Sequence, residues 1–468
     1  MRSVILARLL LAEDFGLFGM ALTVVAGLGA LTSIGLDLSV IKTKFKSDLE
    51  VAKHLDTLWT VDLIRRVLIA LLMLVIARPA AKFYGEARVY QLLLVLSLLP
   101  VVQGFQNIGL LMHRKDVNFK RIVFLELLTN LLTAIATIAL VLWTHSVWAL
   151  VLSQLISAFI GVALSYLFHP YRPHPQLDNN SLRLVLDFGK YAFLLSVLGY
   201  VMSMADNVLI GKLYSAAILG TYVIAYNLAV LPLHGVGMAI VNVTFPAYAE
   251  IAGGDVTGGE LKRLERAFVR VFAASSTLLT LTTALLLLLG DEIVVFLYGS
   301  KWVAAGIILR ILALLVFFKG HAILVSPLII SMRGIAPDAK IKLIEATIFL
   351  ILLYPLTNRY GVRGAAWAGA AAFFVVMINR LRIAASLLPN VAGMLVRTVL
   401  SAAIACALGI TAGTFAIASI ESVVGRLFLG SAVIAAVVGS VMPIMSTELR
   451  TELRRLFSSV QQVQNGDR

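Results

Sequence analysis

The chain has 468 residues with 39 Lys and Arg against 25 Asp and Glu, which gives a formal net charge of +14. Its residues are 60% hydrophobic and 14% charged, with a mean hydropathy of +0.95, whereas a soluble domain is about half apolar and about a quarter charged. Most of the chain is therefore expected to lie in lipid. The single cysteine, Cys406, excludes an intrachain disulfide framework and a multi-cysteine metal site. The basic residues lie between apolar stretches rather than in one patch, so nucleic acid is not expected as a partner.

Apolar stretches of about twenty residues recur along the whole chain, each long enough to cross a hydrocarbon core of about 30 Å. They are too long for barrel strands, so the fold class predicted is an all-α integral membrane protein. The first stretch is too short to cross, and it lacks the cleavage site of a secretory signal. The predicted spans are residues 2–12, 15–38, 58–77, 89–111, 122–143, 147–168, 186–211, 216–246, 267–289, 303–330, 341–357, 364–388, 396–418 and 427–445.

The loops between these fourteen spans differ in charge. Loops after even-numbered spans, together with the C-terminal tail, hold 25 Lys and Arg, whereas the loops on the opposite side hold 8. Cytoplasmic loops carry the excess of Lys and Arg in membrane proteins. We therefore predict that the even loops and both termini are cytoplasmic.

A weak internal repeat divides the predicted helices into two halves. An offset of 204 residues superposes residues 6–21 on residues 210–225, and an offset of 219 pairs Trp148 with Trp367. The first offset pairs Arg8 with Lys212, Ala12 with Ala216 and Gly16 with Gly220. Because the repeats are separated by an even number of spans, they have the same topology and are related by an axis along the membrane normal. The predicted organisation is an N-terminal lobe at 1–168, a cytoplasmic linker at 169–185, a second lobe at 186–390, two further spans at 391–445 and a cytoplasmic tail at 446–468.

Several segments resemble the polysaccharide transport branch of the multidrug/oligosaccharidyl-lipid/polysaccharide superfamily, which includes O-antigen and exopolysaccharide flippases. The similarity covers nearly the whole chain and is carried by residues 6–17, 206–232, 245–250, 297–314 and 361–368. The resemblance implies a fold of two six-helix lobes in a pseudo-twofold repeat plus two C-terminal helices. Relatives carry a complete first helix before the turn at residues 6–17, so we expect the first helix here to be truncated.

Charged residues inside spans are candidates for holding an anionic headgroup, because a charge at the bilayer centre costs about 2.5 to 3.5 kcal/mol. Arg65 and Arg66 lie in the third span, with Asp62 one turn before Arg66, and Arg310 and Lys319 lie in the tenth. Nine residues separate the latter two, so they project from opposite faces of a regular helix. Arginine donates two parallel hydrogen bonds to a phosphate, whereas lysine acts as a point charge. We predict that all four cations bind substrate; alternatively, the pair in the third span snorkels to nearby headgroups while Asp62 neutralises one of them.

Uncharged polar residues inside the spans are further candidates. Gln103, Asn107, Asn227 and Asn242 are expected to hydrogen-bond sugar hydroxyls, although hydrogen bonds between helices account for them equally well. Asp206 is a candidate site for a coupling ion, since a carboxylate in a low dielectric exchanges protons near neutral pH. The alternative is that it caps the following turn or pairs with Lys212. No metal ligand set and no cofactor are expected.

Together with the resemblance, these residues favour a lipopolysaccharide or exopolysaccharide biosynthesis flippase in a bacterial inner membrane. Its expected substrate is an undecaprenyl-diphosphate-linked oligosaccharide, which it would move from the cytoplasmic to the periplasmic leaflet by alternating access. The expected partners are membrane lipids, a polysaccharide polymerase or export machinery, and a coupling proton or sodium ion. The alternatives are a drug or cation antiporter of the same superfamily, which would prefer carboxylates in its cavity, and a peptidoglycan lipid-precursor flippase. An enzyme is not expected, because the outer loops are short and no phosphate-binding P-loop motif is present.

Overall fold

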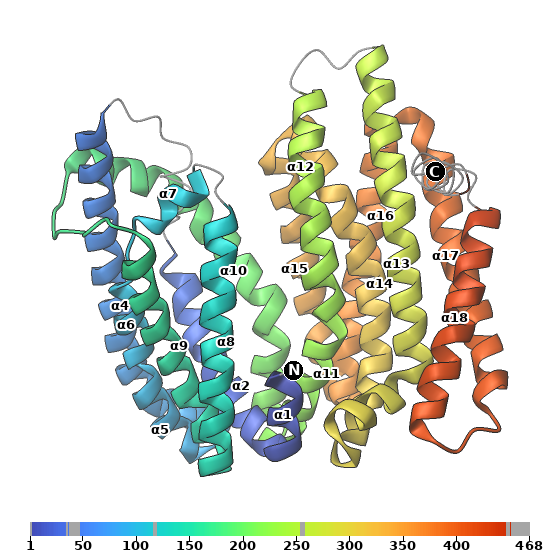
Figure 1. Ribbon diagram of the computed structural model, residues 1–468, viewed down its shortest axis with the longest axis horizontal. Helices are drawn as coiled ribbons and strands as arrows, with labels where there is room; N and C mark the ends of the chain where they lie inside the picture. Colours follow the sequence, from blue (N-terminus) through green and yellow to red (C-terminus); the bar gives the residue numbers. More distant parts are fainter. Residues whose placement is uncertain are drawn as a thin grey trace, which may run out of the picture. The chain divides into compact units, whose positions relative to one another are not determined.

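The computed structural model describes residues 2–33, 36, 47–115, 119–252, 258–445 and 450. Throughout these ranges the chain forms helices joined by short connections, and no strand occurs in them (Figure 1). Contacts between residues group the chain into two compact units, Met1–Val223 and Ile224–Arg468. The lobe boundaries expected from the repeat remain a prediction.

The first unit is a bundle of long helices with several short ones. Its elements are α1 (Arg2–Leu9), α2 (Ala12–Leu31), α4 (Asp48–Tyr84), α5 (Ala87–Leu96), α6 (Leu98–Gly104), α7 (Leu110–Lys115), α8 (Phe119–Thr144), α9 (Val147–Phe168), α10 (Asn179–Leu213) and the first half of α11 (Ala216–Pro232). The short α1 packs against α8, and Arg2 donates a hydrogen bond to Ser153 on α9. The predicted incomplete first span is therefore a helix of 8 residues that packs on its own unit.

The second unit contains the longest helices. Its elements are the rest of α11, a π-helical turn η1 (Leu233–Gly237), α12 (Met238–Ala252), α13 (Gly259–Tyr298), a short 3-10 turn η2 (Ser300–Trp302), α14 (Val303–Arg333), α15 (Ile335–Tyr360), α16 (Val362–Leu387), η3 (Pro389–Val391), α17 (Ala392–Ile417) and α18 (Val423–Met445). Helix α14 packs against both α13 and α16, while α17 and α18 pack against α13. The core of this unit includes the fully buried Phe268 and Phe272.

In the described part of the chain a helix lies in each of the fourteen predicted spans, although the boundaries differ from the prediction and residues 105–109 interrupt the fourth span. Within the described residues, ten helical segments are long and apolar enough to cross a membrane by length and composition. Helix α4 begins at Asp48, ten residues before the predicted start of the third span. The predicted eighth span is interrupted by the π-helical turn that follows Pro232. The chain is thus a multi-pass membrane protein with an all-α fold, as predicted.

A glycine crossing joins α2 to the start of α11 inside the first unit. A Cβ atom on Gly16 would lie 1.7 Å from the carbonyl oxygen of Ala216, and one on Gly220 would lie 1.8 Å from the carbonyl oxygen of Ala12. Only glycine allows the two backbones to approach this closely. The contact is reciprocal: the 204-residue offset pairs Gly16 with Gly220 and Ala12 with Ala216, and each glycine meets the alanine of the other segment. This reciprocity is what a local twofold relation between repeated segments produces.

Candidate functional site

Arg65 and Arg66 lie at the centre of α4 and share one carboxylate. The helix has 37 residues, so it is about 55 Å long and Arg66 is its middle residue. Asp62 lies one turn earlier, and its Oδ1 accepts from Arg65 Nη2 at 2.6 Å while its Oδ2 accepts from Arg66 Nε at 2.7 Å. The side chains are 19%, 21% and 13% exposed for Arg65, Arg66 and Asp62. Two guanidinium groups against one carboxylate leave the cluster with a net positive charge.

Gln103 joins this cluster from α6. Its Oε1 accepts a hydrogen bond from Arg66 Nη1 at 2.7 Å. The approach of the two helices depends on Gly104, since a Cβ there would lie 2.9 Å from the Leu63 side chain and 3.3 Å from Cδ of Arg66. The structure therefore brings Gln103, which the sequence predicted separately, to the pair of arginines in the third span. We call Asp62, Arg65, Arg66 and Gln103 the arginine cluster.

The arginine cluster retains hydrogen-bonding capacity for an anion. Arg65 uses its Nε and Nη2 on Asp62, and Arg66 uses its Nε on Asp62 and its Nη1 on Gln103. A guanidinium carries more N–H donors than these contacts use, and they lie in one plane. Asp62 and Gln103 fix the two planes, so a phosphate would meet donors that are already oriented. Such a group is suited to bind an anion rather than to perform covalent chemistry.

Asn107 lies close in sequence to this cluster but serves the connection between α9 and α10. Its Nδ2 donates to the carbonyl oxygens of His169 and Tyr171 at 3.1 and 2.7 Å, and its Oδ1 accepts from the amide of Gly109. Asn107 is buried. These contacts match the structural alternative for this residue, and its role in sugar binding stays a prediction.

The connection at residues 169–178 is anchored to the first turns of α4. Oδ1 of the buried Asp56 accepts from the Tyr171 hydroxyl at 2.7 Å and from the His174 amide at 2.9 Å. Thr57 and Thr60 accept from the amides of Asp178 and Gln176. The sequence does not predict these contacts, because residues 39–57 are expected to form a loop before the third span. The signal in the sequence is the polar set Asp56, Thr57 and Thr60, which covers one turn of a helix.

Asp206 is a buried carboxylate between α10 and α11. Its Oδ2 accepts from the Tyr222 hydroxyl at 2.7 Å, and its Oδ1 accepts from the amide of Asn207 at 2.8 Å. Lys212, the partner considered for it, donates instead to the carbonyl oxygen of Phe83 at 2.7 Å. Ion coupling at Asp206 stays a prediction.

In the second unit, Arg310 pairs with Asp291. Arg310 Nη2 lies 2.6 Å from Asp291 Oδ2, and the two side chains are 41% and 34% exposed. Asp291 follows a kink in α13 at Leu289, and a Cβ on Gly306 would lie 2.0 Å from its Oδ1. Sequence reasoning identified Arg310 but not this partner. Both residues belong to the second unit. The charge of Arg310 is thus offset by a carboxylate that the sequence does not predict as its partner.

A buried ionic network on α14, α15 and α16 was also missed. Arg380 Nη2 lies 3.0 Å from Asp338 Oδ1, with side chains 5% and 3% exposed. Ser326 donates to the same oxygen, and Arg380 also donates to the Ala322 carbonyl oxygen. The buried Glu345 interacts electrostatically with Arg380 and with the predicted residue Lys319.

The remaining predicted residues are dispersed. The Nζ of Lys319 lies 5.0 Å from the centre of the Phe373 ring. Asn227 is exposed on α11. The side chain of Asn242 lies outside the described residues. Among the described residues no cluster of His, Cys, Asp and Glu suited to a metal ion occurs.

A family model described as "Polysaccharide biosynthesis protein" matches residues 5–307. The chain belongs to the polysaccharide biosynthesis protein family. Among curated relatives, the succinoglycan biosynthesis transport protein ExoT of Rhizobium meliloti (strain 1021) is 24% identical over 313 residues, covering 66% of this chain and 61% of ExoT. The teichuronic acid biosynthesis protein TuaB of Bacillus subtilis (strain 168) is 23% identical over 292 residues, covering 60% of this chain and 57% of TuaB. The matches thus span about three fifths of these relatives' own length.

A third relative and two solved structures extend the comparison. The lipopolysaccharide biosynthesis protein WzxC of Escherichia coli (strain K12) is 21% identical over 352 residues, covering 74% of this chain and 69% of WzxC. The lipid II flippase MurJ in an inward closed conformation superposes with a TM-score of 0.70 at 14% identity, covering 93% of this chain and 94% of MurJ. An inward-facing multidrug resistance transporter of the MATE family, in the MOP superfamily, gives 0.61 at 14% identity, covering 83% and 94%. The predicted superfamily fold is confirmed.

Proposed function

We propose that this family member is a flippase that moves a lipid-linked oligosaccharide across the bacterial inner membrane. The observation that carries the proposal is the arginine cluster, in which two guanidinium groups at the middle of a long helix share one carboxylate. A net positive, partly buried site with oriented donors matches the diphosphate of an undecaprenyl-diphosphate-linked glycan. The family, the names of the relatives and the fold shared with MurJ support the same function.

The proposed mechanism is alternating access, with no covalent step. The diphosphate would exchange its water shell for the guanidinium groups, while the polyprenyl tail remains in the lipid. Asp62 makes this exchange reversible, because it holds the two arginines in place and offsets part of their charge. Release follows from the modest net charge, since a site with two unpaired cations would retain the anion. A coupling ion at Asp206, a polymerase or export partner and cytoplasmic termini belong to the same proposal.

The test uses proteoliposomes that contain an undecaprenyl-diphosphate oligosaccharide with a fluorescent sugar. Flipping is measured as the loss of fluorescence to an impermeant quencher added outside. We expect Arg66→Ala to lower the rate at least about tenfold, because it removes charge-assisted hydrogen bonds to the diphosphate. Arg66→Lys should recover only part of the rate, since lysine keeps the charge but not the planar donors.

Arg78→Ala is the matched control, because Arg78 is exposed on the same helix and stacks on Tyr90. It should flip at the parent rate. A normal rate in Arg66→Ala would remove the arginine cluster from the mechanism. If the parent protein moved no glycan lipid but expelled a cationic dye when a proton gradient was imposed, the antiporter alternative would replace the flippase.

A further inference from the structure

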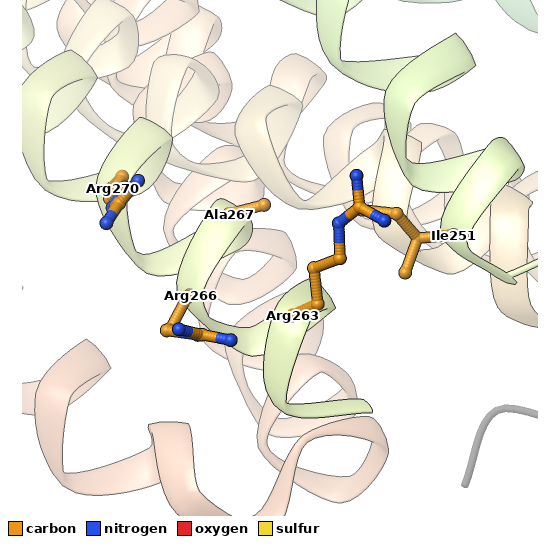
Figure 2. A pocket seen from close by; sticks show the side chains of 5 residues that line it. All are labelled: Ile251, Arg263, Arg266, Ala267 and Arg270. Atoms are coloured by element: carbon orange, nitrogen blue, oxygen red, sulfur yellow. The ribbon is translucent and has the colours of Figure 1, made fainter. Parts of the chain in front are cut away.

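A pocket lined by arginines lies between the end of α12 and the beginning of α13 in the second unit, whereas the arginine cluster belongs to the first. The pocket has a volume of about 420 Å³ and is lined by Ile251, Arg263, Arg266, Ala267 and Arg270. Figure 2 shows the three arginines on one helix, with Arg263 extending toward Ile251 on the neighbouring helix. The lining residues combine three cations with two apolar side chains, and within the described part of the chain they include no acid.

The arginines form a stripe because of their spacing. Positions 263, 266 and 270 fall within about 60° of one another on a helix of about 3.6 residues per turn. The opposite face holds Leu264, Phe268 and Phe272, which are buried in the core of the second unit. The core contacts therefore fix the rotation of α13 about its axis. The stripe faces the pocket as a consequence.

The acidic residue nearest in sequence does not neutralise the stripe. Glu265 is buried on another face of α13, where its carboxylate accepts from Asn390 Nδ2 at 3.1 and 3.3 Å. Arg266 donates through its Nε to the carbonyl oxygen of Lys262. Neither Arg263 nor Arg266 forms an ion pair with a carboxylate among the described residues. Their terminal N–H groups remain available to an external anion.

The stripe also lies at the border between polar and apolar sequence. Helix α13 has 40 residues and is about 60 Å long, and its apolar part begins at Val271, directly after Arg270. In a membrane protein this border lies at the level of the lipid headgroups. Ile251 and Ala267 offer apolar contact beside the arginines, which an inorganic anion would not use.

We propose that this pocket binds the phosphate headgroup of an anionic membrane lipid. Guanidinium groups match phosphate oxygens with paired hydrogen bonds, and the apolar wall matches the glycerol and first methylene groups of a lipid. The proposal does not depend on the flippase function, because the pocket lies in another part of the chain. Any phospholipid with a net negative charge could bind there.

The test measures binding of phosphatidylglycerol with a pyrene label on its acyl chain. The full-length chain is placed in phosphatidylcholine nanodiscs, and the anisotropy of the pyrene fluorescence is followed as labelled lipid is added. Arg263→Gln/Arg266→Gln should weaken binding at least about tenfold, because each lost charge-assisted hydrogen bond is costly. The control is Arg359→Gln/Arg363→Gln, which changes the net charge equally at two exposed arginines and should bind as the parent does.

Two further arms distinguish a shaped lipid pocket from diffuse charge attraction and from a site for soluble anions. Arg263→Lys/Arg266→Lys keeps the charge and should still bind more weakly than the parent; equal binding would mean diffuse attraction of charge and would overturn the pocket. Polyprenyl diphosphate that competes for the labelled lipid would support a phosphate headgroup site. The lipid proposal would be overturned if soluble pyrophosphate competed for the pocket while neither arginine variant changed lipid binding. Equal melting temperatures of the variants and the parent show that folding is unchanged.

Discussion

At the residue scale, Tyr171 shows how one side chain fixes the connection between α9 and α10. Its hydroxyl donates to Asp56 Oδ1 at 2.7 Å and lies 3.1 Å from the carbonyl oxygen of Ala52. Its ring packs on Leu55 and Leu58, which are buried at the start of α4. Burial, followed by the hydrogen bond to Asp56, raises the pKa of Tyr171 above its ordinary value of 10.0. The protonated hydroxyl is therefore the form that the folded chain favours.

Replacing Tyr171 by Phe should lower the free energy of unfolding by about 0.5 to 1.5 kcal/mol, because one hydrogen bond is lost while the ring contacts remain. Because the pKa of Tyr171 is higher in the folded than in the unfolded chain, the hydroxyl contributes its full stabilisation below about pH 10. That stabilisation is lost as the pH rises through the folded-state pKa. The difference between parent and variant should thus be constant from about pH 6 to about pH 9 and shrink at higher pH. Unfolding by detergent titration measures it. Tyr354→Phe, at a residue 58% exposed on α15, is the control, and an equal effect of both substitutions would contradict the role of the hydroxyl.

The site residues were predictable to the extent that their chemistry is local. Arginines inside apolar spans are visible in the sequence, and the spacing of Asp62 to Arg66 on one helix predicts their ion pair. The partner of Arg310 lies on another helix, at Asp291, and Asp338 meets Arg380 across α15 and α16. Such partners depend on how helices pack, and no spacing rule within one segment specifies them.

At the element scale, the glycine crossing of α2 and α11 brings two helix backbones into direct contact within the first unit. The contact is between backbones, because the atoms nearest to a Cβ on Gly16 are the O, C and Cα of Ala216. Flexible side chains elsewhere can yield to an added methyl group, but a helical backbone cannot do so without moving the whole helix. The crossing should therefore tolerate no side chain at either glycine.

Gly16→Ala should lower the free energy of unfolding by about 1 to 3 kcal/mol, the usual cost of overpacking, and Gly220→Ala should lower it by a similar amount because the contact is reciprocal. Gly29→Ala is the matched control on the same helix, where a Cβ meets nothing within 4 Å. It should be neutral or stabilise by up to about 1 kcal/mol. Thermal unfolding in detergent distinguishes these results. A neutral Gly16→Ala would show that the two helices do not cross there.

Helix positions were largely predictable because length and apolar character alone define a membrane span. The sequence did not reveal where helices continue past the bilayer. Helix α4 extends back to Asp48 and α13 back to Gly259, in segments that look like polar loops. In both cases the extension buries an apolar residue, Leu55 in α4 and Leu264 in α13. A window that averages hydropathy over all faces removes that signal.

At the scale of the whole molecule, the distribution of Lys and Arg predicts which loops are cytoplasmic, and the fold alone does not predict this. The 25 to 8 division of Lys and Arg between alternate loops requires the number of spans to be correct, since an error of one would exchange the two sides partway along the chain. Arg172 lies in the connection before α10, and Arg359 lies at the end of α15. Five predicted spans separate them, so the prediction places them on opposite sides of the membrane.

Single cysteines test this directly, because the chain has only Cys406, which is buried and can be replaced by serine. In that background, Arg359→Cys in intact spheroplasts should react with a membrane-impermeant maleimide, whereas Arg172→Cys should react only after the membrane is permeabilised. The physical reason is that Lys and Arg are retained on the cytoplasmic side during insertion. The opposite pattern would invert the predicted orientation. Reaction of both cysteines from the same side would show that an even number of membrane-crossing helices lies between them. The predicted boundaries of the two lobes would then be wrong.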